Sequence, residues 1–285
     1  MTNRKTKVAL LSVASNTVLI ILKVIAGIIS GSVSIISEAI HSGMDLLASI
    51  IALFSVRNSG KPADEDHPYG HGKIENVSGV TEGILIFIAA ALIITEAIKK
   101  IINPHEVTET TIAIVVMLIS AVTNIVVSKI LYKVAKEEDS IALEADALHL
   151  KTDVYTSAGV ALGLLLIKFT GISMLDPIVA ILVALLIIKE AWHLCTSAFE
   201  PLMDKSLSAE DIEKIKKIIG DHKAEFIDYH SLRTRKAGNI RHLDFHLVVK
   251  SDLSVQESHD ITERIEQDLE KNIGNTVTKI HIEPA

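Results

Sequence analysis

Two histidine–aspartate pairs stand out among the apolar residues of the first 200 positions. The first pair is His41 and Asp45, and the second is His149 and Asp153. Both have i,i+4 spacing, so in a helix the imidazole and the carboxylate lie on one face, one turn apart. Together they offer two nitrogen and two oxygen ligands, which suit a tetrahedral divalent ion such as Zn²⁺. The two negative charges would neutralise that ion in apolar surroundings.

The same interval of 108 residues separates the two histidines and the two aspartates. Each pair would lie on the middle helix of a three-helix half, so the halves would cross the membrane in opposite directions around one site near the midplane. A single intramembrane histidine is usually only a hydrogen-bonded polar group, but the duplication favours a ligand set. Glu38, one turn from His41, is either a proton carrier or an interfacial carboxylate. Asn16 and Asn124 are expected to join helices.

A second candidate group lies in the polar segment between the second and third apolar stretches. Asp64, His67 and His71 fall within eight residues, and Gly70 and Gly72 permit tight turns there. The segment is therefore either a metal site or an ordinary polar loop.

The last 81 residues contain a third group, with six of the twelve histidines. In a strand, His281 and Glu283 share one face, as do His242 and His246. Imidazoles mixed with carboxylates suit borderline divalent metals better than calcium or magnesium. One or two metal sites are expected, although any one of these histidines could be an ordinary surface residue.

The composition indicates how these groups are positioned. Of 285 residues, 49% are hydrophobic and 22% charged, and the mean hydropathy is +0.40, which is too apolar for a soluble domain of this size. We predict an α-helical membrane domain over residues 1–204 and a cytoplasmic domain over 205–285. The six predicted transmembrane helices, each about 20 residues or more with flanks, are 8–29, 33–56, 76–95, 110–128, 145–167 and 177–198.

Charge places the predicted loops on the two sides of the membrane. Nine Lys/Arg lie in the amino terminus and the second and fourth connecting segments, against three in the opposite loops. Both termini are therefore expected in the cytoplasm of a multi-pass plasma-membrane protein. The net charge of −7 gives no reason to expect a nucleic-acid partner. The single Cys195 excludes a multi-thiolate metal cage.

The final segment has the pattern of an α+β domain. Helical periodicity over 209–219 and 255–273 alternates with strand patterns near 230–235, 242–249 and 277–283. The predicted order is αββαβ. Such a small domain would gain stability by packing against a second subunit.

With these motifs in view, the whole chain resembles the cation diffusion facilitators, close to the bacterial ferrous-iron and zinc efflux type. The stretches that carry the resemblance are Ser34–Asp45, Pro62–Lys73, Asp146–Asp153, His230–Arg235 and Ile280–Pro284. The resemblance implies a homodimer with six transmembrane helices per subunit and a metallochaperone-like cytoplasmic domain. It also implies proton-coupled export of a divalent metal.

Residue by residue, the resemblance assigns three sites. The transport site would be His41, Asp45, His149 and Asp153; the loop site Asp64, His67 and His71; the cytoplasmic-domain site His230, His246, His259, His281 and Glu283. Similar proteins have Asp at the positions of His41 and Glu283. The extra imidazole at 41 favours zinc, and the change at 283 is conservative. The resemblance also implies a charge pair between Lys73 and Asp204.

The expected function is therefore antiport, with Zn²⁺ leaving the cytoplasm in exchange for protons. The alternatives are Fe²⁺ or, behind it, Co²⁺, Mn²⁺ or Cd²⁺ as cargo, and a membrane metal sensor that does not transport. An intramembrane metalloprotease is disfavoured because the sequence has no His-Glu-x-x-His motif, and because four ligands leave a tetrahedral ion no open position for water. We therefore expect no enzymatic activity.

Overall fold

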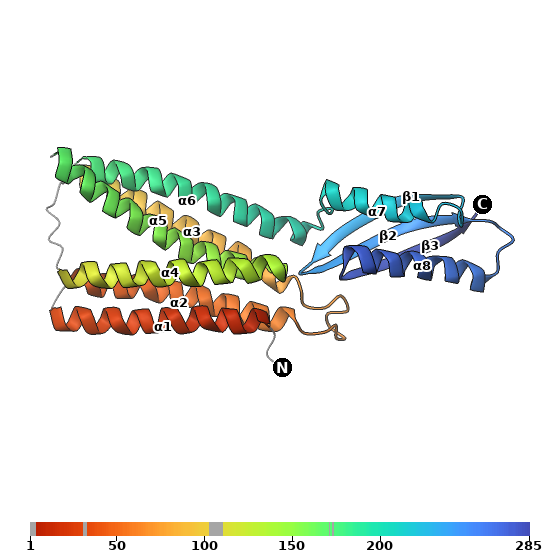
Figure 1. The fold of residues 1–285 in the computed structure, drawn as a ribbon, viewed down its shortest axis with the longest axis horizontal. Helices are drawn as coiled ribbons and strands as arrows, with labels where there is room; N and C mark the ends of the chain where they lie inside the picture. Colours follow the sequence, from red (N-terminus) through yellow and green to blue (C-terminus); the bar gives the residue numbers. More distant parts are fainter. Residues whose placement is uncertain (1–3, 31–32, 103–110, 171, 173) are drawn as a thin grey trace. The chain divides into compact units, whose positions relative to one another are not determined.

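The computed structural model describes residues 4–30, 33–102, 111–170, 172 and 174–285 (Figure 1). The chain forms two compact units. The first comprises Met1–Gly70 with Ile74–Phe199, and the second comprises His71–Lys73 with Glu200–Ala285.

The first unit is helical, as the sequence predicts. Its six helices are α1 Arg4–Ser30, α2 Val33–Ser59, α3 Ile74–Ile102, α4 Thr111–Glu137, α5 Ile141–Thr170 and α6 Leu175–Phe199. Each has at least 25 residues, enough to cross the hydrocarbon core at 1.5 Å per residue.

Length and hydropathy identify four of these helices as membrane spans, counting only residues that the structure describes. The four segments are Arg4–Ala26, Ile74–Ile102, Leu118–Glu137 and Pro177–Met203. The helices without such a segment, α2 and α5, carry the predicted ligands. An apolar helical domain is thus confirmed, and the crossing of α2 and α5 remains a prediction from the six-span pattern.

Small side chains allow the helices of this unit to pack closely. The main contacts join α1 with α2, α3 with α6, and α4 with α5. Ala48 and Ala52 of α2 are fully buried, and a Cβ atom at Gly83 of α3 would overlap Cys195 Sγ of α6. Small residues at helix contacts are typical of membrane bundles, where close packing replaces the hydrophobic effect.

A buried ion pair ties four helices of this unit together. Lys5 Nζ of α1 lies 2.8 Å from Glu75 Oε1 of α3, and both side chains are almost fully buried. Glu75 also accepts hydrogen bonds from Ser59 at the end of α2 and from Ser140 before α5. The carboxylate is therefore both paired and hydrogen-bonded, which buried charges require.

The second unit has the predicted αββαβ order. After the 3₁₀ helix Glu200–Met203, its elements are α7 Ala209–Asp221, β1 Asp228–Ala237, β2 Ile240–Val249, α8 Val255–Ile273 and β3 Thr276–Pro284. The sheet order is β1-β2-β3, with β1 antiparallel and β3 parallel to β2. The predicted α+β fold is confirmed.

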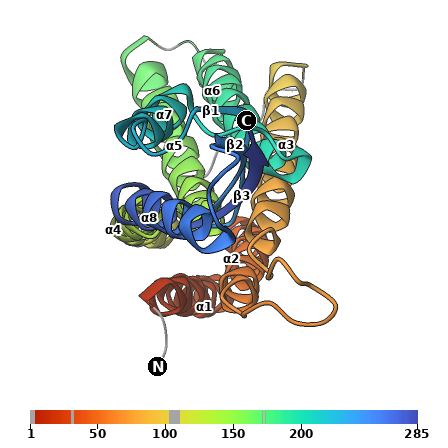
Figure 2. The same ribbon diagram turned by 90° about the vertical axis from the view of Figure 1, so that its right-hand side faces the viewer.

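Both helices of the second unit cover the same face of the sheet (Figure 2). Alternate residues of β2, among them Leu243, Phe245 and Leu247, are buried against Ile215 of α7 and Ile265 of α8. The strand alternation leaves His246 on the opposite face. A capping box of Ser254 and Glu257 starts α8.

His222, at the end of α7, connects that end to α8. Its Nδ1 lies 2.9 Å from Glu225 Oε1 and its Nε2 lies 2.9 Å from Asp268 Oδ2. Arg264 also pairs with Glu225. Burial lowers the pKa of His222, but the hydrogen bonds and charges of Glu225 and Asp268 outweigh burial, so its pKa is raised above 6.5.

We therefore predict that the second unit loses stability as the pH rises. The folded-state pKa of His222 is above its unfolded value, so the stabilisation is complete below about pH 6.5 and is lost as the pH rises through the folded-state pKa. Proteolysis of the detergent-purified chain in increasing urea, at about pH 6 and about pH 9, should cleave residues 209–285 at lower urea in the alkaline sample. His222→Gln should reduce this difference, and an unchanged difference in that variant would contradict the assignment.

Candidate metal sites

The first candidate site lies inside the helical unit, where α2 meets α5. One ligand atom from each of Asp45, His149 and Asp153 lies within 4.8 Å of the other two. His149 Nε2 is 3.2 Å from Asp45 Oδ1. Asp45 and His149 are only 5% and 6% exposed. Two carboxylates and an imidazole at this depth are costly unless protons or a cation neutralise them.

Polar side chains from α1 and α4 surround this group. Asn124 Nδ2 of α4 donates to Asp153 Oδ2 at 3.3 Å. Asn16 Nδ2 of α1 donates to the Asp45 carbonyl oxygen at 3.4 Å and to Ser49 Oγ at 2.7 Å. Both asparagines therefore join helices, as the sequence predicts, and do so at the candidate ligands. The contact from Asn124 is of the kind that orients a ligand side chain, whereas Asn16 contacts the backbone of α2 at Asp45.

Sequence reasoning did not identify Asp146 as part of this region. Asp146 is fully buried, and Ser49 Oγ donates to its Oδ1 at 3.0 Å. Asp146 lies one helical turn before His149, and this i,i+3 spacing could have pointed to it. Glu82 of α3 is also fully buried. It lies on a different helix from the candidate ligands, so no helical spacing in the sequence could have pointed to it.

His41 belongs to α2, one turn before Asp45. Its side chain, like that of Glu38, lies outside the part of the chain whose side chains the structure describes. The fourth ligand therefore stays a prediction.

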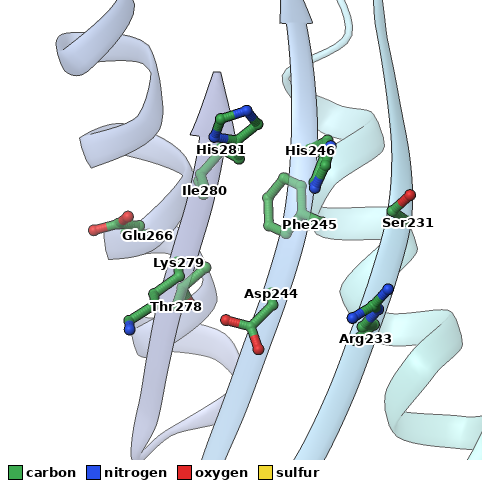
Figure 3. A pocket seen from close by; sticks show the side chains of 10 residues that line it. All are labelled: Ser231, Arg233, Asp244, Phe245, His246, Glu266, Thr278, Lys279, Ile280 and His281. Carbon is green, nitrogen blue, oxygen red and sulfur yellow. The ribbon is translucent and has the colours of Figure 1, made fainter. Parts of the chain in front are cut away.

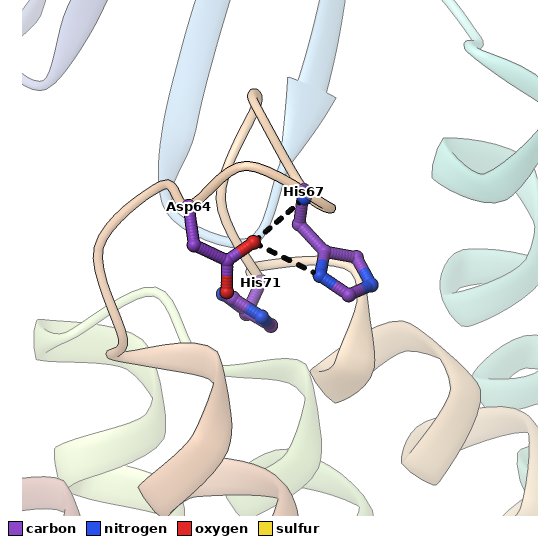
Figure 4. A group of neighbouring side chains, drawn as sticks. All are labelled: Asp64, His67 and His71. Atoms are coloured by element: carbon purple, nitrogen blue, oxygen red, sulfur yellow. Dashed lines mark hydrogen bonds and ion pairs between the residues drawn. The ribbon is translucent and has the colours of Figure 1, made fainter.

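The loop group comes together as the sequence spacing suggests (Figure 4). One ligand atom from each of Asp64, His67 and His71 lies within 4.8 Å of the others. Asp64 Oδ1 accepts a hydrogen bond from the His67 backbone amide at 2.7 Å and lies 3.2 Å from His67 Nδ1. Gly70 has φ +78°, a left-handed conformation that favours glycine. The exposed side chains of Asp64 and His67 leave this group open to solvent.

The third group lies on the uncovered face of the sheet in the second unit. The strand register places His230 of β1 opposite His246 of β2, and His246 opposite His281 of β3. Glu283 lies between them: its carboxylate is 2.8 Å from His246 Nδ1 and 3.4 Å from His230 Nε2. His281 Nε2 is 4.0 Å from the same carboxylate.

This group adjoins a pocket of about 610 Å³ (Figure 3). His246 and His281 line one end of the pocket, and Arg233, Asp244 and Lys279 line another part. The predicted ligand His259 lies elsewhere, on the exposed surface of α8. Of the five ligands predicted for the cytoplasmic-domain site, His230, His246 and Glu283 have ligand atoms within 4.8 Å of one another.

The predicted charge pair is present within the second unit. Lys73 Nζ lies 2.8 Å from Asp204 Oδ1, and Arg235 lies 3.5 Å from the same oxygen. The hydrogen bond from Lys73 is the main reason that the pKa of Asp204 is lowered. Asp204 itself has φ +53°.

Fold and sites together define a class: a helical membrane protein with a small α+β domain and histidine–carboxylate groups in both units. A family model described as the cation efflux transmembrane domain matches residues 9–203. A second, described as the cytoplasmic domain of cation efflux proteins, matches residues 207–285. The chain therefore belongs to the cation efflux family, the cation diffusion facilitators, and is a divalent metal cation efflux transporter.

Similar proteins come from several bacteria. An uncharacterized transporter of Synechocystis is 34% identical over 97% of this chain and 89% of its own length. The cation-efflux pump FieF of Shewanella oneidensis is 33% identical over 88% of this chain and 84% of its own. The manganese efflux system protein MneP of Bacillus subtilis is 32% identical over 98% of this chain and 95% of its own.

A solved structure of CzrB in its Zn form is also similar to part of the chain. It is 33% identical and covers 28% of this chain and 92% of the solved chain, with a TM-score of 0.28.

The sheet group yields a second prediction. His246→Ala removes the imidazole at the centre of the three-strand register, so zinc binding there should weaken by at least about tenfold, since even outer contacts of a metal site are worth that much. The bound zinc per full-length chain, measured by elemental analysis after gel filtration, should fall. His193→Ala, which removes an exposed imidazole from α6, is the control. Equal losses in both variants would contradict a site at His246.

Proposed function

We propose that this transporter is an antiporter that exports Zn²⁺ from the cytoplasm in exchange for protons. The cargo site would consist of His41, Asp45, His149 and Asp153, between α2 and α5. The observation that supports it most is the convergence of Asp45, His149 and Asp153 inside an apolar helical bundle.

Charge neutralisation is the physical basis of this cargo site. Two ionised carboxylates in a low-dielectric bundle are strongly unfavourable, and a divalent cation bound to them cancels their charge. With two imidazoles the ligand set becomes tetrahedral and mixed in nitrogen and oxygen, as zinc prefers. The hydrogen bond from Asn124 to the Asp153 carboxylate supports a preorganised ligand.

Proton exchange follows from the same atoms. His149 Nε2 faces Asp45 Oδ1 at 3.2 Å, the distance of a hydrogen bond. A proton on Nε2 must leave before that nitrogen can coordinate Zn²⁺, and a returning proton displaces the ion. Metal and protons thus compete for one site, and histidine makes this exchange accessible near neutral pH.

The remaining sites would regulate transport. We assign residues 1–204 to the membrane domain and 205–285 to a cytoplasmic domain that binds metal and dimerises, with both termini in the cytoplasm of a plasma-membrane homodimer. Two histidines and Glu283 meeting across the sheet support metal sensing there. The binuclear set would also include His259 and His281. The loop group of Asp64, His67 and His71 would take up a further ion.

Two alternatives to this proposal differ in cargo or in activity. The first has Fe²⁺, Co²⁺, Mn²⁺ or Cd²⁺ as the cargo, and a relative 32% identical is named a manganese efflux protein. The order in which divalent metals bind such ligands is a poor guide to the metal that the cell delivers. A membrane metal sensor could use the second unit alone, but it would move neither metal nor protons.

The cargo site predicts the effect of removing its charges. Asp45→Asn combined with Asp153→Asn should lower zinc uptake into inside-out proteoliposomes at least about 100-fold, because both carboxylate ligands and the charge that neutralises the buried cation are lost, and even an outer contact of a metal site is worth about tenfold. An internal pH indicator should report protons leaving the vesicle as zinc enters in the unmodified protein, and no such change in the double variant. Asp252→Asn, an exposed carboxylate in the turn before α8, should transport normally. Near-normal flux in the double variant would exclude this site.

Cargo selection should depend on the imidazole at position 41. The unmodified protein is expected to favour zinc over iron(II) and manganese, and His41→Asp should broaden transport toward cadmium and iron because a harder oxygen ligand replaces a nitrogen. Competition between these ions for uptake into proteoliposomes measures both. If iron moves as well as zinc before the substitution, selectivity does not come from His41.

A further inference from the structure

A groove on the helical unit, lined by none of Asp45, His149 and Asp153, carries an excess of positive charge. It has a volume of about 430 Å³ and lies along α4, α5 and α6. Its lining residues come from all three helices, and α5 packs against both α4 and α6. Its lining residues include Lys129, Tyr132, Lys133 and Lys136 of α4.

Positive charge exceeds negative charge along this groove. Four lysines line it, the three of α4 and Lys151 of α5, against two carboxylates, Glu144 and Glu190. Lys136 Nζ is bound to Glu144 Oε1 at 2.7 Å, and the charge of Glu190 acts on Lys151. Within the part of the chain that the structure describes, Lys129 and Lys133 form no ion pair.

Lys129 and Lys133 bring two positive charges close together in the groove. Lys129 and Lys133 are one turn apart on the same face of α4, and both are exposed. Both lie within a segment apolar enough to span the membrane. Two ammonium groups there repel a divalent cation, so the groove is unsuitable as a path for the cargo.

The groove also offers apolar surface beside the charges. Leu148 and Leu194 line it, and the Tyr132 ring beneath Lys136 is about half exposed. A ligand that fits both properties has an anionic head and apolar chains. Basic pockets between transmembrane helices suit the headgroups of anionic lipids, and each lysine near such a surface contributes measurable attraction.

We propose that this groove binds the phosphodiester headgroup of an anionic phospholipid from the leaflet at the α4–α5 turn. Lys129 and Lys133 contact the phosphate, while the acyl chains lie against the apolar walls of the helices. This proposal is independent of the transported metal and of proton coupling.

Native mass spectrometry of the full-length protein in detergent tests the site. Dioleoylphosphatidylglycerol should remain bound at concentrations where dioleoylphosphatidylcholine does not, and Lys129→Gln with Lys133→Gln should weaken its binding about tenfold. The matched control is Lys7→Gln with Lys189→Gln, which removes the same charge from exposed positions outside the groove. An excess of inorganic phosphate should not displace the lipid.

Three results would overturn the proposal. The first is equal retention of the two lipids, and the second is an equal loss in both double variants, which would mean a diffuse attraction to positive charge. The third is displacement by inorganic phosphate, which would make the groove a site for a free anion. Thermal unfolding in phosphatidylcholine alone should be the same for all variants, which separates lost binding from lost folding.

Discussion

The cost of an uncompensated charge in an apolar interior is the constraint on which the helical unit depends. A carboxylate among closely packed helices must meet a cation, a proton or several donors, and these partners come from other helices. Glu75 is satisfied by Lys5 of α1 and by Ser59 and Ser140. These contacts join residues of α1, α2 and α3 with the residue before α5, and the contact between Asp45 and His149 joins α2 to α5 a second time.

In the second unit the backbone hydrogen bonds of the sheet, rather than buried charges, determine which side chains lie together. The register of β1, β2 and β3 sets three histidines side by side on one face, because cross-strand neighbours must lie about 5 Å apart. The other face is closed by α7 and α8. One face thus supplies the folding energy and leaves the other free to carry polar side chains.

The helical unit keeps opposite charges in different places. The acidic side chains that could hold a cation are buried between α2 and α5, whereas the surplus lysines of α4 are exposed at the groove. Such a separation is physically reasonable: buried acid attracts cations where dielectric screening is weak, and exposed base favours anionic lipid without opposing the cargo. The two features share α4 and α5, which present different residues to each.

The sequence by itself determined the apolar helices, the αββαβ order and the ligand pairs spaced one turn apart, because each depends on local periodicity. The resemblance to the cation diffusion facilitators also implied the pair of Lys73 and Asp204, which the structure joins at 2.8 Å. Only the tertiary structure decided which atoms meet: Asp45 with His149, Ser49 with Asp146, and His230 and His246 with Glu283. Those contacts depend on helix packing and strand register between segments far apart in the chain, which local spacing does not specify.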